Sequence, residues 1–264
     1  MSDMIQNWHV YSAGSPENQP ILFLHGFMGS GKIWLPTFEQ LESDFYCVAL
    51  DLPGHGTTEA NLDKLTFDSL AESLADYIES TFSRPPIVVG YSMGGRIALY
   101  TALKYPDSVA SLVMESSTAG IADGYERKKR LMQDTNLAEI LKKSEMRQFL
   151  IDWYEQPVFA YLAKHPGLVE RIIDKKSHGN PQSLAQVMVK LSPGNQPPLW
   201  DKLGQWIKPT LIIAGSIDAK YFEIGQRLRE KLNNARLEVI EGAGHIVHLE
   251  KHKEFMSVLK SFLS

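Results

Sequence analysis

The segment around Ser92 constrains this chain more than any other, because an apolar run, a Gly-x-Ser-x-Gly turn and a helical pattern follow one another there. Residues 87–89 predict a buried strand, and residues 96–100 open a helix. Gly90 and Gly94 are needed where a Cβ would clash in so tight a turn. The pattern is typical of a nucleophile elbow, which exposes the serine beside a helix N-terminus that favours an anion. The alternative is a glycine-rich turn with an incidental serine, and the flanking strand and helix argue against it.

Apolar runs and helical patterns alternate on both sides of this segment. Strands are expected at residues 20–24, 46–50, 111–115, 208–215 and 237–240, with a weaker candidate at 8–11, and helices at 67–82, 221–232 and 250–262. This alternation predicts an α/β fold with a mostly parallel sheet and right-handed connections.

The middle of the chain has a different pattern. From about residue 116 to residue 206 there is helical periodicity but no convincing strand. A helical insertion between two strands of such a sheet is typical of a cap over an active site. We therefore expect a core formed by residues 1–115 and 207–264, with a helical cap at 116–206.

Charge and cysteine usage exclude several classes of partner. The 31 acidic and 27 basic residues leave a net charge of −4, which gives no positive field for nucleic acid. The N-terminal residues lack the basic and apolar segments of a secretory signal, and no apolar run approaches the length of a membrane span. Cys47 is the single cysteine and is expected to be a buried, inert thiol. We expect a cytoplasmic protein with neither nucleic acid nor membrane as a partner.

Three residues could form a catalytic triad. Ser92, Asp218 and His245 occur in the order Ser…Asp…His, and the last two each follow a predicted strand. Because strand ends converge at one edge of a parallel sheet, these residues can meet there. His245 would take the proton of Ser92, and Asp218 would fix the histidine tautomer and stabilise the imidazolium.

The oxyanion hole and the rival bases can also be placed. We assign the two oxyanion donors to the backbone N–H groups of Phe27, in a glycine-rich loop after a strand, and Met93, after the serine. His55 is a rival base, but Gly and Pro on both sides indicate a structural loop. His248 is the other rival, one helical turn after the triad histidine, and we expect it to cap or pack.

Arg96, four positions after the serine, bears on the substrate. A neutral ester would not need a guanidinium there, and burying an unpaired charge is costly. Arg96 therefore indicates either an anionic substrate or an internal carboxylate partner. Arg127 and Arg130 in the insertion could form a second anion clamp, or simply a solvated helix face. Whether Lys220 reaches a ligand is left open.

Four motifs carry a resemblance to a known family: residues 24–30 (LHGFMGS), 51–56 (DLPGHG), 90–96 (GYSMGGR) and 152–159 (DWYEQPVF). Together they resemble the 2-succinyl-6-hydroxy-2,4-cyclohexadiene-1-carboxylate synthases, which have the α/β-hydrolase fold. The resemblance covers nearly the whole chain. The first two motifs are shared with a vast superfamily, whereas the last two in combination are much more specific.

The resemblance implies a carbon–oxygen lyase of menaquinone or phylloquinone biosynthesis. That reaction eliminates pyruvate from 2-succinyl-5-enolpyruvyl-6-hydroxy-3-cyclohexene-1-carboxylate and needs neither a metal nor an organic cofactor. The triad would provide the base, and our hypothesis is that Ser92 acts as that base rather than as an acylated nucleophile. The partner would be a small polycarboxylate, bound by a monomer or a weak homodimer.

The resemblance also assigns the substrate-binding residues. Arg96 and Arg130 would grip carboxylates, whereas Tyr91, Trp153 and Phe159 would line the pocket and Arg127 is a weaker match. Two other functions stay open at this point. One is a serine hydrolase for an acidic ester or a C–C bond, working through an acyl-enzyme on the same triad. The other is a non-catalytic ligand receptor on this scaffold.

Overall fold

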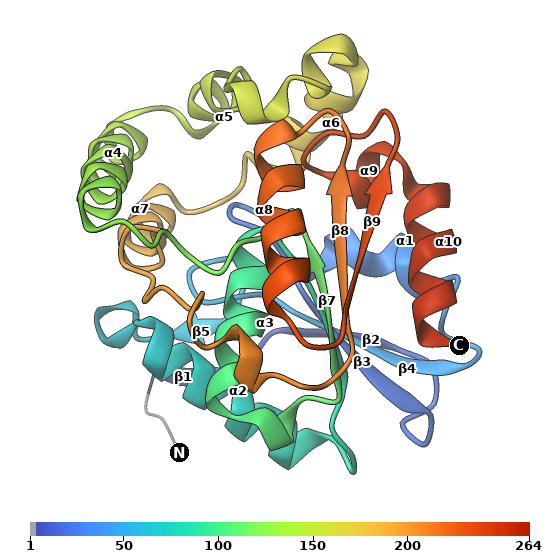
Figure 1. The fold of residues 1–264 in the computed structure, drawn as a ribbon. Helices are drawn as coiled ribbons and strands as arrows, with labels where there is room; N and C mark the ends of the chain where they lie inside the picture. Colours follow the sequence, from blue (N-terminus) through green and yellow to red (C-terminus); the bar gives the residue numbers. More distant parts are fainter. Residues whose placement is uncertain (1–3) are drawn as a thin grey trace.

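A seven-stranded sheet forms the centre of the molecule in the computed structural model, which describes residues 4–264 (Figure 1). The strand order is β2-β4-β3-β6-β7-β8-β9. The strands are β2 (Val10–Ala13), β3 (Gln19–Leu24), β4 (Phe45–Leu50), β6 (Ile87–Tyr91), β7 (Ser111–Glu115), β8 (Thr210–Gly215) and β9 (Ala235–Ile240). Only the edge strand β2 is antiparallel to its neighbour, so the predicted mostly parallel sheet is confirmed.

The N-terminal strand candidate at 8–11 was misplaced. β1 (Ile5–Asn7) pairs with β5 (Glu59–Ala60) in a small separate sheet, and β2 begins only at Val10. Between them, the His9 N–H donates to Thr58 Oγ1 at 2.9 Å and the His9 carbonyl accepts from the Asp51 N–H. These bonds to a loop replace a strand ladder at this position.

Two helical layers cover the sheet, as alternate residues of its strands require. Leu22 and Leu24 face a core with α2 (Phe67–Thr81), α3 (Met93–Lys104) and α8 (Ala219–Lys231). Ile21 and Phe23 face a second core with α1 (Leu35–Phe38) and α10 (His252–Leu263). The last helix, expected at residues 250–262, is α10. The short helix α9 (Val247–Glu250) before it was not expected, and it ends before Lys251, whose φ of −138° separates the two helices.

The segment between β7 and β8 folds beyond one end of the sheet (Figure 1). It contains α4 (Gly124–Lys143), α5 (Met146–Tyr154), α6 (Pro166–Lys176) and α7 (Pro181–Lys190), joined by turns such as η4 (Pro157–Phe159), and no strand occurs in this described stretch. Phe149 and Phe159 from this segment share a buried cluster with Tyr91 of the core. The assignment of residues 116–206 as a cap domain stays a prediction.

The structure also bears on the single cysteine and on membrane-spanning helices. Cys47 lies buried in β4, and burial raises the pKa of its thiol to about 12. It therefore stays protonated and unreactive, as expected. Within residues 4–264, no helix has both the length and the apolar character needed to cross a bilayer.

Candidate active site

Ser92 occupies a strained turn between β6 and α3. Its φ is +51° with ψ −107°, a conformation that L-residues seldom adopt outside functional turns. The turn fits only because of its glycines. A Cβ on Gly90 would lie 2.5 Å from the Gly95 nitrogen, and one on Gly94 would lie 2.2 Å from the Leu24 oxygen. Both positions therefore exclude any side chain, and the strain holds the serine hydroxyl beyond the end of the strand.

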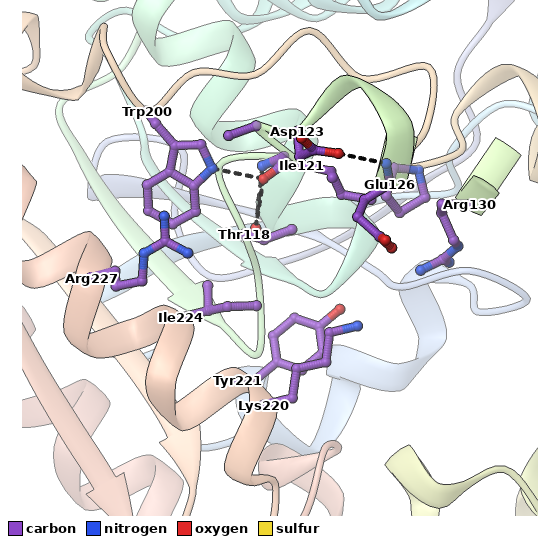
Figure 2. Close-up of a pocket in the computed structure, with 13 residues that line it drawn as sticks. Thr118, Ile121, Asp123, Glu126, Arg130, Trp200, Lys220, Tyr221, Ile224 and Arg227 are labelled. Carbon is purple, nitrogen blue, oxygen red and sulfur yellow. Dashed lines mark hydrogen bonds between the residues drawn. The ribbon is translucent and has the colours of Figure 1, made fainter. Parts of the chain in front are cut away.

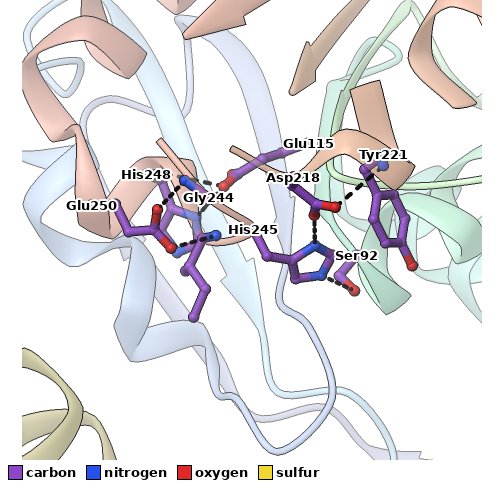
Figure 3. Close-up of polar contacts among 9 residues, drawn as sticks. Ser92, Glu115, Asp218, Tyr221, Gly244, His245, His248 and Glu250 are labelled. Carbon is purple, nitrogen blue, oxygen red and sulfur yellow. Dashed lines mark hydrogen bonds and ion pairs between the residues drawn. The ribbon is translucent and has the colours of Figure 1, made fainter. Parts of the chain in front are cut away.

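The structure brings the three predicted triad residues together (Figure 3). His245 Nε2 lies 3.2 Å from Ser92 Oγ, and His245 Nδ1 lies 2.7 Å from Asp218 Oδ2. Asp218 follows β8 and caps α8, since its other oxygen accepts from the Tyr221 N–H at 3.3 Å. Asp218 and His245 are both buried, so their bond is shielded from water. This is the geometry that a histidine needs to polarise a serine hydroxyl.

The role of the two predicted oxyanion donors stays a prediction, with which their hydrogen bonding is consistent. Neither the Phe27 N–H nor the Met93 N–H donates to another backbone group within residues 4–264. Phe27 precedes Met28, which has a φ of +58°, and the Met28 N–H donates to His55 Nε2 at 3.0 Å. This hydrogen bond to His55 fixes the loop that carries Phe27.

His55 has the structural role expected of it. It is buried, and its Nδ1 lies 3.0 Å from the Pro53 carbonyl while its Nε2 binds Met28. Burial lowers its pKa to about 4, so the ring is neutral at physiological pH. His25 supports the same loop, because its Nε2 accepts from the Leu52 N–H at 2.9 Å. Neither histidine is placed to serve Ser92.

His248, the other rival base, is also engaged elsewhere. Its Nδ1 lies 2.8 Å from Glu115 Oε2, and its ring stacks on Trp34 with the centroids 4.5 Å apart (Figure 3). His248 and Glu115 are both completely buried. The Tyr91 ring packs against both His248 and His245, and so separates this pair from the triad.

Two of the three predicted pocket aromatics pack against the triad histidine, and their role in lining a substrate pocket stays a prediction. The Phe159 ring lies 5.8 Å from the His245 ring, edge to face, and comes from the segment between β7 and β8. Trp153 from the same segment lies 5.7 Å from Phe27. Tyr91 lies 5.5 Å from His245, and burial raises the pKa of its hydroxyl well above the usual value.

Arg96 is the cation nearest in sequence to the serine, and it is buried without a counter-ion. Its side chain is 7% exposed, and Nη1 donates to Gln196 Oε1 at 3.2 Å. The guanidinium lies over the Phe67 ring, and burial lowers its pKa to about 10. No carboxylate of the described chain pairs with it. Of the two explanations offered for Arg96, the internal carboxylate is therefore absent from residues 4–264.

Arg130 differs from Arg96 in this respect. Its Nε lies 2.9 Å from both carboxylate oxygens of Asp134, which also accepts from Ser192 Oγ at 2.6 Å. The end of the guanidinium borders a cavity of about 340 Å³ (Figure 2). Arg127, one turn earlier on α4, is not among the residues that line this cavity. A carboxylate grip by Arg130 or Arg127 stays a prediction.

The cavity lies between the loop after β7 and the first turns of α4 and α8 (Figure 2). Tyr221 lines it and also packs on His245, with the ring centroids 4.6 Å apart. Lys220 lines it too, and burial together with the charge of Arg130 lowers its pKa. The acidic side chains of Asp123 and Glu126 border the same space.

Three residues near the site escaped the sequence analysis. Tyr221 contacts the triad histidine, Gln196 holds Arg96, and Lys176 donates to the Tyr154 hydroxyl at 2.7 Å. Burial lowers the pKa of Lys176 to about 8. Lys176 lies in a polar run that is typical of a solvated helix, so only the fold reveals its contact with Tyr154. Within residues 4–264, no cluster of three His, Cys, Asp or Glu side chains could hold a metal ion.

Comparisons with known proteins agree with this geometry. A family profile described as the alpha/beta hydrolase fold matches residues 19–252. A putative 2-succinyl-6-hydroxy-2,4-cyclohexadiene-1-carboxylate synthase from Bacillus subtilis (strain 168) is 31% identical over 97% of this chain and 94% of that protein. Protein PHYLLO, chloroplastic, from Arabidopsis thaliana is 30% identical over 97% of this chain, which spans only 16% of that protein. The solved structure of MenH from S. aureus superimposes with a TM-score of 0.92 at 28% identity, covering 98% of each chain.

Proposed function

Because the chain belongs to the α/β-hydrolase family, and within it to the 2-succinyl-6-hydroxy-2,4-cyclohexadiene-1-carboxylate synthases, we propose that it eliminates pyruvate from 2-succinyl-5-enolpyruvyl-6-hydroxy-3-cyclohexene-1-carboxylate. The observation that carries this proposal is Arg96, a buried guanidinium without a counter-ion on the helix that follows the triad residue Ser92. A site for a neutral ester would lose stability by burying that charge and would gain no contact with the substrate from it.

The names of substrate and product define the bonds that change. The substrate has one ring double bond, at C3, and the product has two, at C2 and C4. A proton therefore leaves C2 and the enolpyruvyl oxygen leaves C5. C2 carries the succinyl group, and removing its proton therefore places negative charge on the succinyl carbonyl oxygen. The electrons then form the diene as the C5–O bond breaks. The departing enolate takes up a proton and becomes pyruvate.

The triad and the backbone donors supply what this elimination needs. His245 takes the hydroxyl proton of Ser92 as the serine oxygen removes the C2 proton as a general base, and Asp218 holds the resulting imidazolium in place. His245 can then return the proton to the departing enolate. The N–H groups of Phe27 and Met93 would receive the charge on the carbonyl oxygen, which is typically worth about 3 kcal/mol for each donor.

The cations around the triad match a substrate with three carboxylates. Those groups are on the ring, on the succinyl arm and on the enolpyruvyl arm. Arg96 and Arg130 are candidates for two of them, and Lys176, whose only polar contact in the described chain is the Tyr154 hydroxyl, is a candidate for the third. Tyr91, Trp153 and Phe159 would enclose the ring.

We also infer where and with what the protein works. A near-neutral charge balance and a single buried cysteine support a cytoplasmic enzyme of menaquinone or phylloquinone biosynthesis, acting on a small polycarboxylate as a monomer or weak homodimer.

The test is to generate the cyclohexene substrate in situ with the enzyme of the preceding step and to follow pyruvate release. The wild type should release pyruvate well above the spontaneous rate. Ser92→Ala should lower kcat roughly 10²- to 10⁴-fold because the base is removed. Arg96→Ala should lower kcat/KM by roughly tenfold or more, whereas the exposed control Arg229→Ala should not.

Two outcomes would count against the proposal. Pyruvate release at the spontaneous rate would remove the elimination, and a panel of acidic esters and C–C substrates would then test the hydrolase alternative. An acyl group on Ser92, seen by mass spectrometry during turnover, would show that the serine is a nucleophile rather than a base.

A further inference from the structure

We propose that Gln196 is a positioning residue, which orients Arg96 for a carboxylate of the ligand while leaving the charge of the guanidinium uncompensated. This inference rests on the proposed function only in taking the ligand to be an organic acid. It adds to the site a residue from the loop after α7, near the end of the segment between β7 and β8.

The contact between the two side chains is buried and specific. Arg96 lies on α3, and Gln196 lies 100 residues later, in the loop between α7 and β8. Gln196 is 1% exposed, and its Oε1 accepts the only hydrogen bond that the Arg96 side chain donates within residues 4–264. A guanidinium has only donors, so the amide oxygen must face it. The amide nitrogen therefore points away, and Nε2 is buried without a partner.

This arrangement is costly for the fold. A buried donor without a partner and a buried cation without a counter-ion each destabilise a protein. A glutamate in place of Gln196 would remove both defects, because its carboxylate would accept from Arg96 and would have no N–H to satisfy. The chain thus carries a neutral partner where a charged one would be more stable, which is typical of functional positions.

Nothing else in the neighbourhood neutralises Arg96. The one carboxylate found to influence the pKa of Arg96 is Asp134, and that group is already bound to Arg130 and Ser192. Arg130 itself adds a repulsive positive charge. An incoming carboxylate would therefore be the first counter-ion that Arg96 meets, and Gln196 would hold the guanidinium at a fixed angle for a bidentate contact.

Gln196→Glu is the decisive substitution, since it keeps the shape and adds the missing counter-ion. We expect the midpoint of thermal unfolding to rise by roughly 2–4 °C, because the buried guanidinium gains a partner. We expect KM for the cyclohexene substrate to rise roughly ten- to hundredfold, because the internal carboxylate competes with the ligand. Gln205→Glu, which adds a charge at an exposed position of the same loop, is the matched control and should change neither value.

A binding measurement separates this role from the elimination. Levulinate reproduces the succinyl arm, and pyruvate is the leaving group. Each acid and its methyl ester can be titrated by calorimetry or by thermal shift. We expect the wild type to bind one or both acids and neither ester, and Gln196→Glu to lose that binding while Gln205→Glu keeps it. Which acid binds identifies the carboxylate concerned.

The two possible failures can be told apart. Acid binding that depends on Gln196, in a protein that releases no pyruvate, supports the positioning role and removes only the elimination. Unchanged KM and unchanged acid binding in Gln196→Glu would overturn the positioning role. If that variant does not fold, Gln196→Met, which frees Arg96 without adding charge, should raise KM severalfold with a smaller change in kcat. An equal fall in kcat and stability with constant KM would indicate a purely structural contact and overturn the proposal.

Discussion

Glu250 and His245 are linked through the backbone. The Glu250 carboxylate accepts hydrogen bonds from the N–H groups of Gly244 and Ile246, the residues on either side of the triad histidine (Figure 3). The bond from Ile246 measures 3.0 Å. Each oxygen thus fixes one end of the peptide that carries the imidazole, and hydrogen bonds to a charged acceptor are the stronger kind.

We expect Glu250→Gln to lower kcat roughly tenfold while KM changes little. An amide offers one oxygen and places an NH₂ group against the second backbone N–H, so the loop loses one bond and gains a repulsion. Small displacements of a catalytic group cost rate rather than binding. Steady-state kinetics of pyruvate release measures the split between kcat and KM.

Glu254→Gln is the control for this substitution, because Glu254 is exposed one turn further along the chain. It should behave as the wild type. Glu250→Asp, which keeps both acceptors on a shorter side chain, should recover part of the rate. A Glu250→Gln enzyme with normal kcat would mean that the loop is held by its other contacts.

Gly94 in the elbow and Gly124 in α4 predict opposite effects of substitution by alanine. A Cβ on Gly94 would lie 2.2 Å from the Leu24 carbonyl oxygen, whereas one on Gly124 meets nothing within 4 Å. Gly94→Ala should therefore lower the free energy of unfolding by about 2 kcal/mol or more. Gly124→Ala, at the first turn of α4, should raise it by roughly 0.5–1 kcal/mol. Urea unfolding of both variants gives the comparison, and a stable Gly94→Ala would refute the tight packing of the elbow.

The elbow and the sheet could be predicted because their signals are local. Residues 87–96 carry strand, turn and helix in one continuous stretch, and the apolar runs mark most strands to within a few residues. The strand at 8–11 was displaced because its residues bond to a loop far away in sequence, including Thr58. The final helix was predicted to within two residues, whereas α9 just before it was missed because four residues carry too little periodicity.

The partners of the site residues could not be predicted, because the tertiary fold brings them together. Arg96 signalled either an anion or a carboxylate partner, and only the fold shows that its contact is the amide of Gln196. Arg130 is the exception, because its partner Asp134 lies four residues later on the same helix, a local contact that the sequence could have shown. Lys176 had no signal at all, since a buried lysine and a solvated one look alike in sequence.

Lys176 predicts a rise in stability with pH in a defined window. Burial lowers its pKa from 10.5 to about 8, so between these values the unfolded chain binds more protons than the folded one. The contribution of this group to stability therefore increases as pH rises from 8 to 10.5, by up to about 3 kcal/mol. Lys176→Met should lack this increase, whereas the exposed control Lys175→Met should keep it.

Urea unfolding at pH 7.5 and pH 10 of the three proteins measures the effect of Lys176. If Lys176 also holds a substrate carboxylate, KM should rise in the wild type above about pH 8, where the ammonium loses its proton. A wild-type pH dependence identical to that of Lys176→Met would show that this lysine is charged in the folded chain throughout the window.

His55 predicts a second pH window with the same sign, a loss of stability and activity in acid. Burial lowers its pKa from 6.5 to about 4, and the neutral ring accepts the Met28 N–H next to the oxyanion donor Phe27. Between pH 6.5 and 4 the unfolded chain binds more protons than the folded one, so this contribution to stability is complete above pH 6.5 and is lost as pH falls towards 4.

His55→Gln tests this prediction, because glutamine keeps a hydrogen-bond acceptor but does not titrate. The stability of this variant should depend less on pH in this window, whereas the exposed control His178→Gln should match the wild type. Urea midpoints between pH 4.5 and pH 7 measure the difference, and equal slopes for His55→Gln and wild type would remove His55 as the acid-sensitive support of the oxyanion loop.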